Sequence, residues 1–240
     1  MISYKQLYNK FYLILISLLF FACSKSTNQN SNFHIVGQMK DVMWKGKLGP
    51  SIQLDTIKKT KGLYGLGPVS FLTGELVINN GQTYVSKVTS DTTMVVEKTN
   101  KIGAPFFVYA NNTEWNSIDL PKEIQSILEL ENFIKKKSTK IRQPFVFKLK
   151  GKIHTAKIHI QNLPKGSIVR SPKQAHQGQI NYKLKEENCT IIGFYSESHQ
   201  GVFTHHDSYL HMHLLTNDKQ KMGHLDEVDF KTMKLYLPKN

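Results

Sequence analysis

Cysteine is scarce in this chain, and its scarcity limits the kinds of site that the protein can carry. Only 2 of the 240 residues are Cys, which excludes a disulfide-stapled scaffold and any four-thiolate zinc or iron–sulfur centre. Proline and glycine are also modest, at 8 and 15 residues, while hydrophobic residues make up 40%. Collagenous, disordered and low-complexity chains are therefore excluded. We predict a globular protein in which any metal is held by His and carboxylate side chains.

The chain also lacks a hydrophobic run long enough to cross a bilayer as a helix. Its N-terminal apolar run, residues 11–22, is shorter than the ~20 residues that a membrane helix needs. A basic start and a short apolar run are typical of a secretory signal peptide, and the following L-F-F-A-C resembles a bacterial lipobox. We expect residues 1–22 to be removed and Cys23 to be lipidated. Residues 23–32 would then tether the domain 33–240 to a membrane of the bacterial cell envelope; a plain signal peptide or an uncleaved anchor are the alternatives.

Acidic residues are outnumbered by basic ones, 18 to 32, so the formal net charge is +14. Such a charge suggests nucleic acid as a partner, but the basic residues are spread along the chain. The one compact run, Lys at 135–137, ends a predicted helix, where cations favour the C-terminal end of the helix dipole. An exported chain would also meet little nucleic acid. We predict a solvated basic surface near an anionic membrane and no nucleic-acid partner.

Hydrophobic patterns predict a strand-rich fold of the α+β class. Alternation over 75–78 and 83–88, around the turn N-N-G at 79–81, predicts a β-hairpin. Helical spacing after Pro121, from Ile124 onward, predicts one main helix that covers the flank of a sheet. A short helix is expected at 39–44, and further strands at 104–109, 145–149, 153–160, 179–185, 189–195, 209–215 and 234–237.

These elements predict two packed, mixed or antiparallel β halves with few helices. The pattern changes from helix to strand near 138–143. We therefore place a possible boundary there, between sub-halves 33–140 and 141–240.

The strongest chemical signal is a group of histidines near the C-terminus. His211 and His213 occupy positions i and i+2 of a predicted strand, so their side chains point to the same face. His224 follows a polar turn, and an antiparallel return strand would bring it opposite the pair. Three neutral imidazoles with one open position form a catalytic zinc site. Alternatives are a chance H-x-H among 10 His, a rival ligand set at His205-His206, and a cupin, whose expected Glu ligand is missing here.

The sequence around these histidines resembles the alpha-acetolactate decarboxylase family. That family carries H-L-H-F, a polar turn and G-G-H-V-L-D, and this chain carries H-M-H-L at 211–214 and M-G-H-L-D at 222–226. The family's G-L-G-T-F-x-x-L-D-G-E resembles G-L-G-P-V-S-F-L-T-G-E at 65–75. Two further strands of the family resemble G-A-P-F at 103–106 and G-F-Y at 193–195. The resemblance runs over nearly the whole predicted domain.

The resemblance implies a two-part α+β protein with zinc in the cleft between its halves, usually as a homodimer. Family members convert 2-acetolactate to acetoin and carbon dioxide, and the zinc polarises the substrate carbonyl. His211, His213 and His224 would hold the zinc. Glu75 matches the family's active-site glutamate and would relay the proton that completes acetoin; the alternative is a solvated hairpin residue.

Three positions depart from the family pattern. His159 stands where a catalytic arginine is expected, and an imidazole lacks the permanent charge and two-pronged geometry of a guanidinium. Arg170 or Lys157 would have to compensate. Pro68 replaces an active-site threonine and has no hydroxyl group. A second active-site glutamate, beyond the third histidine, has no counterpart in this sequence.

Two functions from different classes remain. The first is zinc-dependent decarboxylation of 2-acetolactate or a related 2-hydroxy-3-keto acid, with Glu75 and His159 as catalytic residues. The second is a non-catalytic, zinc-binding envelope lipoprotein that keeps the fold. The three departures favour the second, and the retained histidines with Glu75 favour the first, because packing alone gives no reason to keep three convergent imidazoles. We expect the enzyme.

Other histidines and the second cysteine have simpler interpretations. Cys189 lies in an apolar run and is expected in the core. His34, His176 and His199 stand alone and are expected at the surface or in hydrogen bonds. His154 is an odd number of residues from His159 on the same predicted strand, so the two cannot share a face unless a bulge intervenes.

Overall fold

Strands dominate the described part of the chain, as the alternating hydrophobic pattern predicts. The structure is a computed structural model that describes residues 32–239. The expected signal peptide, Cys23 and nearly all of the tether, residues 1–31, lie outside the described residues. Residues 32–240 form one compact unit.

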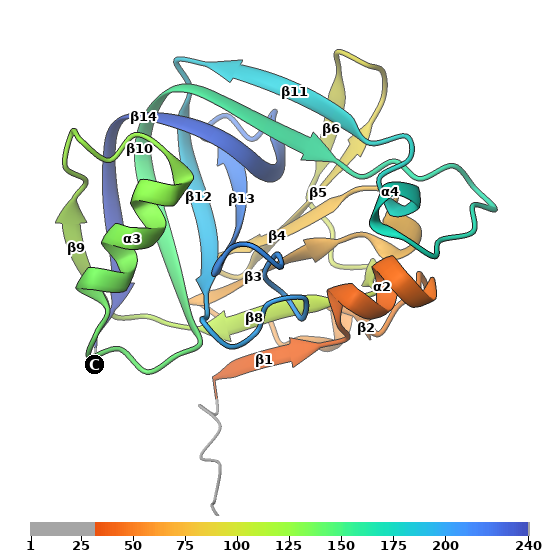
Figure 1. The fold of residues 1–240 in the computed structure, drawn as a ribbon, viewed down its shortest axis with the longest axis horizontal. Coiled ribbons are helices and arrows are strands. Elements are labelled where there is room, and N and C mark those ends of the chain that lie inside the picture. Colours follow the sequence, from red (N-terminus) through yellow and green to blue (C-terminus); the bar gives the residue numbers. More distant parts are fainter. Residues whose placement is uncertain (1–31, 240) are drawn as a thin grey trace, which may run out of the picture. The chain divides into compact units, whose positions relative to one another are not determined.

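The first sheet has six antiparallel strands in the order β1-β8-β3-β4-β5-β6 (Figure 1). Its strands have the bounds β1 Phe33–Val36, β3 Leu63–Pro68, β4 Glu75–Asn79, β5 Gln82–Val88, β6 Met94–Glu97 and β8 Phe107–Asn111. Two short strands, β2 Ile52–Gln53 and β7 Gly103–Ala104, pair with each other and form a separate two-stranded sheet. The predicted hairpin is confirmed, because Asn80 and Gly81 adopt φ of 52° and 86°, the left-handed values that the tight turn between β4 and β5 requires.

The second sheet also has six strands, in the order β11-β10-β12-β13-β14-β9. Its strands have the bounds β9 Trp115–Asp119, β10 Phe145–Ile160, β11 Ile180–Lys185, β12 Asn188–Tyr195, β13 Leu210–Thr216 and β14 Met222–Pro238. Strand β14 pairs with β13 and also with β10. Because β10 continues through β12 to β13, these four strands close on themselves, and their inner faces enclose a core.

Two of these strands are longer than the sequence predicts. Strand β10 runs unbroken over the two predicted strands, because Gly151 has a φ of 151° and lies where a Cβ would meet the Thr232 carbonyl oxygen. Only glycine tolerates both conditions, so the chain bends without ending the strand. Strand β14 starts at Met222, because its first residues pair with β13 and β10. Strand β9 was not predicted at all.

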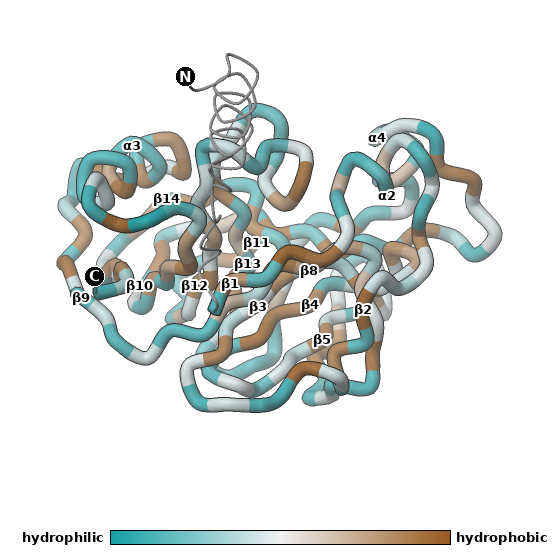
Figure 2. The backbone as a smooth tube through the Cα atoms, turned by 90° about the horizontal axis from the view of Figure 1, so that it is seen from below, coloured by the Kyte–Doolittle hydropathy of each residue, from teal (hydrophilic) through white to brown (hydrophobic). Residues whose placement is uncertain are grey.

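The described residues contain three α-helices, α2 Met39–Lys45, α3 Ile127–Lys137 and α4 Pro172–Ala175. The main helix begins later than predicted, because Ser126 and Glu129 form a reciprocal capping box at its N-terminus. Ile124 lies before the cap and packs on the core from a turn. Lysines 135–137 lie in the last turn, as predicted. Helices α2 and α4 contact each other at the end of the molecule that is opposite to α3 (Figures 1 and 2).

The second sheet begins earlier in the chain than the predicted boundary at 138–143. Strand β9 pairs with β14, and α3 packs against the same sheet through Leu130 and Ile134. The chain therefore passes from the first sheet to the second between β8 and β9. The sequence pattern marked the end of α3 instead, because hydrophobic periodicity reports the type of an element and not the sheet that it joins.

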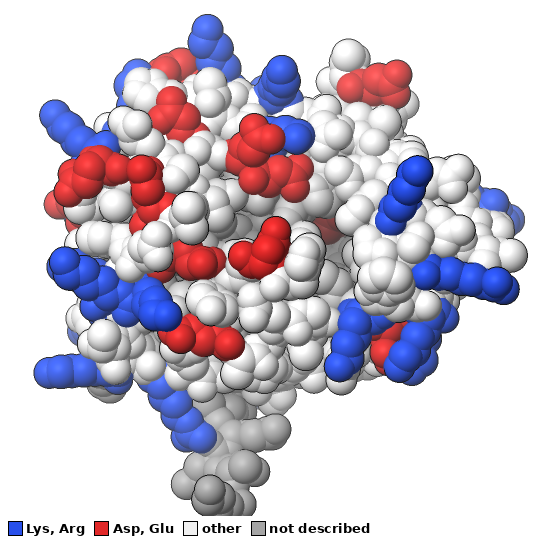
Figure 3. Space-filling view, viewed as in Figure 1, with Lys and Arg blue, Asp and Glu red and all other residues white. Residues whose placement is uncertain are grey.

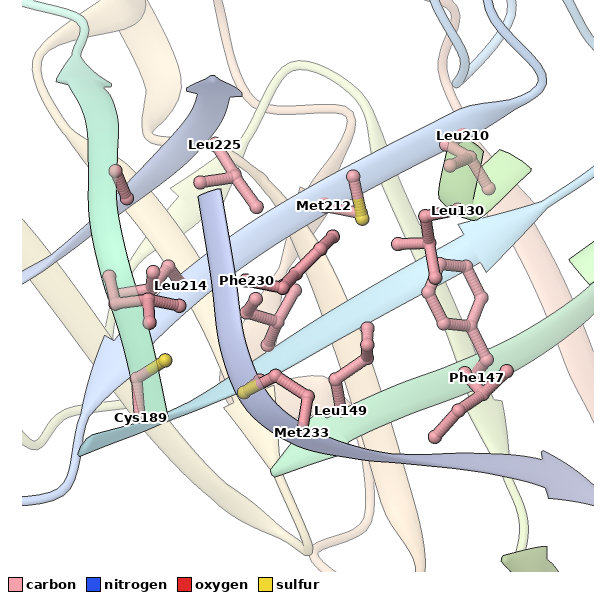
Figure 4. Close-up of a cluster of buried hydrophobic side chains, with 14 of the residues drawn as sticks. Leu130, Phe147, Leu149, Cys189, Leu210, Met212, Leu214, Leu225, Phe230 and Met233 are labelled. Atoms are coloured by element: carbon pink, nitrogen blue, oxygen red, sulfur yellow. The ribbon is translucent and has the colours of Figure 1, made fainter. Parts of the chain in front are cut away.

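Hydrophobic side chains fill the space enclosed by the second sheet. Figure 4 shows part of this cluster, which includes Phe147, Leu149, Leu214 and Met233. Cys189 belongs to it at 1% exposure, as predicted, and burial raises the pKa of its thiol to about 12. In Figure 2 the hydrophobic stretches run along the strands and the hydrophilic ones gather in the peripheral loops.

A separate apolar layer joins the two sheets face to face. The first sheet contributes Leu66 and Val77, and the second contributes Phe194 and Leu215. Because side chains alternate along a strand, every second residue of β4, β13 and β14 points into this layer. The predicted site residues are among them, since Glu75 shares a face with Val77, and His211 and His213 share one with Leu215.

No α-helix within residues 32–239 is both long enough and apolar enough to cross a membrane.

A glycine lets β14 approach β10 beside the site. A Cβ on Gly223 would lie 2.5 Å from the His159 carbonyl oxygen, whereas a Cβ on Gly49 would meet nothing within 4 Å. We expect Gly223→Ala to lower the free energy of unfolding by about 1–3 kcal/mol, because the two strands must move apart, and Gly49→Ala to change it little. Urea unfolding measures both. Equal midpoints for the two variants would contradict this close approach.

Candidate metal centre

Three adjacent strands place four imidazoles side by side on the face of the second sheet that is turned toward the first sheet. His213 of β13 pairs directly with His224 of β14, and His224 pairs on its other side with His159 of β10. His211 lies two residues before His213 on the same face. Directly paired residues have Cβ atoms ~4.5–5.5 Å apart, so the strand register alone brings these rings together.

The three predicted ligands converge, as the sequence analysis expected. Ring centroids of His211, His213 and His224 lie 5.0–5.5 Å from one another. Each ring offers a nitrogen within 4.8 Å of a nitrogen of the other two. All three residues are at most 7% exposed. A second possible ligand group, made by His159, His224 and Asp226, shares His224 with the first.

Burial keeps these imidazoles in the form that binds metals. It lowers the pKa of His213 to about 3 and that of His211 and His224 well below the usual value, and the neighbouring imidazoles add to the shift. Neutral imidazole is the metal-binding form. His211 Nδ1 and both ring nitrogens of His213 are buried with no hydrogen-bond partner within the described residues. Unpaired buried nitrogens are costly, and a metal ion would satisfy them, so the residues present fit a metal.

Glu75 approaches this cluster from the opposite sheet. Its Oε2 lies 3.6 Å from His213 Nε2, and its Oε1 accepts a hydrogen bond from the Gln161 backbone N–H at 3.3 Å. Burial raises the pKa of the Glu75 carboxyl well above its usual value, and the nearby Asp226 charge adds to the shift. The carboxyl is 2% exposed, so the alternative of a solvated hairpin residue is wrong. A protonated carboxyl at this position is a proton donor.

His159 faces the same space, and Asp226 holds it there. Asp226 Oδ1 lies 2.7 Å from His159 Nδ1, while His159 Nε2 lies 4.0 Å from Glu75 Oε1. The Gln161 side-chain nitrogen lies 3.4 Å from the same Nε2. His154, by contrast, points outward to Glu186. Register shifts in the pairing of β10 with β14 do not bring it to the site.

No Lys or Arg of residues 32–239 lines the central pocket. Its walls are made by Met39, Met43, Pro68, Leu72, Glu75, Phe106, His159, Gln161, His176, His205, His211 and His224. Lys157 pairs with Glu227 instead, and Arg170 is exposed. The compensation considered for these two residues is therefore not found. Pro68 does lie in the wall, where the family threonine was expected. Figure 3 shows basic side chains dispersed around one face, with acidic ones between them.

Three pocket residues were missed or left without a role by the sequence. His176 was expected apart from the site, yet it lines the rim, with its ring centroid 6.3 Å from that of His159. His205 reaches His224 with the two Nε2 atoms 3.3 Å apart. Asp226 appeared in the sequence analysis only as the last residue of the motif M-G-H-L-D, with no role assigned to it. The loops that carry His176 and His205 follow no periodic pattern, so no local signal could have placed them.

The geometry predicts that the paired loss of two ligands removes the metal. After loading with zinc and dialysis, the His211→Ala/His213→Ala double variant should retain none, because one imidazole cannot hold the ion. His154→Ala is the matched control, since its ring is exposed and paired with Glu186, and it should retain the wild-type content. Atomic emission of the dialysed proteins gives the stoichiometry. Unchanged zinc in the double variant would refute the ligand assignment.

Comparison with known proteins identifies the family and the fold of the chain. A family model described as alpha-acetolactate decarboxylase matches residues 36–239. The fold is similar to that of alpha-acetolactate decarboxylase from Bacillus subtilis strain 168, with a TM-score of 0.73 and 19% identity over 88% of this chain and 86% of that one. A Staphylococcus aureus protein of unknown function, similar to alpha-acetolactate decarboxylase, matches with a TM-score of 0.72 and 15% identity over 85% of this chain and 84% of that one. No curated protein sequence matches the chain. The chain belongs to the alpha-acetolactate decarboxylase family.

Proposed function

We propose that the protein decarboxylates 2-acetolactate, or a related 2-hydroxy-3-keto acid, to an acetoin-type hydroxyketone and carbon dioxide. The observation that carries this proposal is a group of three convergent, buried imidazoles, two of which have ring nitrogens without a partner among the described residues, facing a buried carboxyl of raised pKa on the other sheet. Decarboxylation of such an acid needs a sink for the electrons left behind and a proton for the new carbon–hydrogen bond. The site offers a group for each need.

His211, His213 and His224 would hold a zinc ion. Three imidazoles with an open position are the ligand set of catalytic zinc, which when bound polarises a carbonyl as a Lewis acid. With only 2 Cys in the chain, thiolate-rich alternatives are absent from the ligand set.

Glu75 would supply the proton. Burial raises the pKa of its carboxyl well above the usual value, and general acids are tuned in this way by burial. Gln161 fixes the carboxyl through its backbone N–H. The acid therefore faces the metal ligands from the opposite wall of the pocket, where the product carbon would lie.

His159 would bind the substrate carboxylate. Its Nδ1 donates to Asp226 at 2.7 Å, and its Nε2 faces the pocket, 3.4 Å from the Gln161 side-chain nitrogen. A single N–H gives one contact in place of the two that a guanidinium offers. Carbon dioxide forms more readily when the substrate carboxylate is bound less tightly. The presence of His159 in place of the family arginine is therefore compatible with turnover.

The direct test is acetoin formation by the purified protein from racemic 2-acetolactate. Zinc-loaded protein should form acetoin above the spontaneous rate, and chelator-treated protein should not. A zinc-loaded, folded protein that forms none from this or related 2-hydroxy-3-keto acids would refute the proposed activity.

Replacing the acid should separate catalysis from metal binding. We expect Glu75→Gln to lower kcat by about 10²–10⁴-fold, the usual contribution of a general acid, and to leave the zinc content unchanged, because the amide keeps the shape of the carboxyl but gives up no proton. Steady-state kinetics and zinc analysis of the same preparation give both results. Full activity in this variant would exclude Glu75 as the proton donor.

Substitutions at His159 should act on substrate binding. His159→Ala should raise KM about tenfold or more, the range expected for loss of a charged hydrogen bond, whereas His159→Arg should keep KM at or below the wild-type value, because a guanidinium can pair with Asp226 and with a carboxylate. Initial-rate kinetics against substrate concentration measure both. If alanine and arginine change KM equally, His159 does not contact the substrate carboxylate.

One observation favours a second candidate, a non-catalytic metal-binding module. The pocket has a small cavity volume, about 30 Å³, and no described basic side chain other than imidazole lines it. Zinc binding with no turnover of any keto acid is the result that would support this module over the enzyme.

A further inference from the structure

A loop brings a fifth imidazole to the metal centre. Residues 196–209 connect β12 to β13, and backbone N–H groups of Met39 and Lys40 donate to the carbonyls of Val202 and Gly201 at 2.8 and 2.9 Å. Phe203, at 1% exposure, packs between the sheets. The loop is thus held at two points, and His205 lies two residues after Phe203.

His205 points into the pocket and its neighbour His206 does not. The His205 ring lines the pocket, whereas His206 is exposed. The one hydrogen-bond-distance contact of His205 among residues 32–239 is to another imidazole, with His205 Nε2 3.3 Å from His224 Nε2.

This separation matches two ligands on one ion. Zinc–nitrogen bonds of ~2.0–2.1 Å at a tetrahedral angle place the two nitrogens about 3.3–3.4 Å apart. The ring centroids of His205 and His224 lie 5.0 Å apart, within the range of the other ligand pairs, and those of His205 and His211 lie 6.2 Å apart. A rotation of the His205 ring toward His211 would complete a four-nitrogen set.

The other polar groups of the pocket are less suited to this position. Asp226 is engaged by His159 at 2.7 Å. Glu75 comes from the facing sheet, and its Oε1 accepts a hydrogen bond from the Gln161 backbone N–H. His159 Nδ1 donates to the same Asp226. Of Asp226, Glu75, His159 and His205, only His205 has no hydrogen-bond partner outside the ligand set among the described residues.

We propose that His205 is a fourth ligand, which closes the metal position that the substrate must open. The inference rests on the proposed function, because it assumes a metal on His211, His213 and His224. A closed four-imidazole site holds no reactive water at rest. A substrate that chelates through its hydroxyl and carbonyl oxygens would displace His205, and the loop would move with it. The small free volume of the pocket follows from the same placement of the ring.

Cobalt substitution tests this inference without reference to activity. Co²⁺-loaded wild-type protein, His205→Ala and His206→Ala are titrated with azide while the visible absorption of the ion is recorded. We expect the azide concentration that half-saturates His205→Ala to be at least about tenfold lower than the one that half-saturates the wild type, because in the wild type the tethered imidazole competes with azide. The His205→Ala spectrum should also change with pH near 7, as a metal-bound water loses its proton, and the wild-type and His206→Ala spectra should not.

The outcomes separate this inference from the function on which it rests. Equal azide affinity in wild type and His205→Ala, with Co²⁺ bound in both, would overturn the fourth ligand and leave the three-histidine site intact. A lower metal affinity in His205→Ala without any change in azide binding would overturn it as well, since it would show that His205 only hydrogen-bonds His224. Failure of the wild type to bind Co²⁺ or Zn²⁺ would overturn both proposals together.

Discussion

The alternation of side chains on two facing sheets is the constraint on which the site depends. In β13 the histidines face the first sheet while Met212 and Leu214 face the enclosed core. In β4 Glu75 faces the second sheet while Leu76 packs on the other side. A slip of one residue in either strand would exchange polar and apolar faces along its whole length. Burial of the large apolar surfaces on both sides of each sheet therefore fixes the strand register, and the register fixes the positions of the site residues.

This arrangement buries polar groups at a cost that the apolar layers must offset. Imidazole nitrogens without partners and a carboxyl between the sheets are destabilising wherever water is excluded. The same exclusion shifts their pKa values in opposite directions, so that the bases are neutral and the acid keeps its proton. A bound metal would turn the unpaired nitrogens into ligands, and any group that binds the folded state alone adds to its stability. Metal binding and folding would therefore be coupled through the same imidazole nitrogens.

Few charged side chains line the pocket. Only 2 Arg occur in the chain, at 142 and 170, and neither lines the pocket. The His159 imidazole lines the pocket, and its position is set by Asp226, two residues after the candidate ligand His224. One short segment of β14 therefore contributes a candidate metal ligand and the residue that orients His159. This coupling makes the pairing of β14 with β10, which Gly223 permits, as important to the site as the ligands themselves.

Features that depend on local spacing could be predicted from the sequence. The period of two in β13 places two histidines on one face, and N-N-G forms the turn of its hairpin. The hydrophobic pattern started α3 too early, because it does not register the capping box of Ser126 and Glu129. The family motifs named Glu75, His159 and the three candidate ligands. The pairing of β9 with the second sheet, the length of β10 and β14, and the meeting of Asp226, His176 and His205 around the pocket follow from the tertiary fold. These contacts join residues from separate strands and irregular loops, where spacing along the chain carries no information about distance in space.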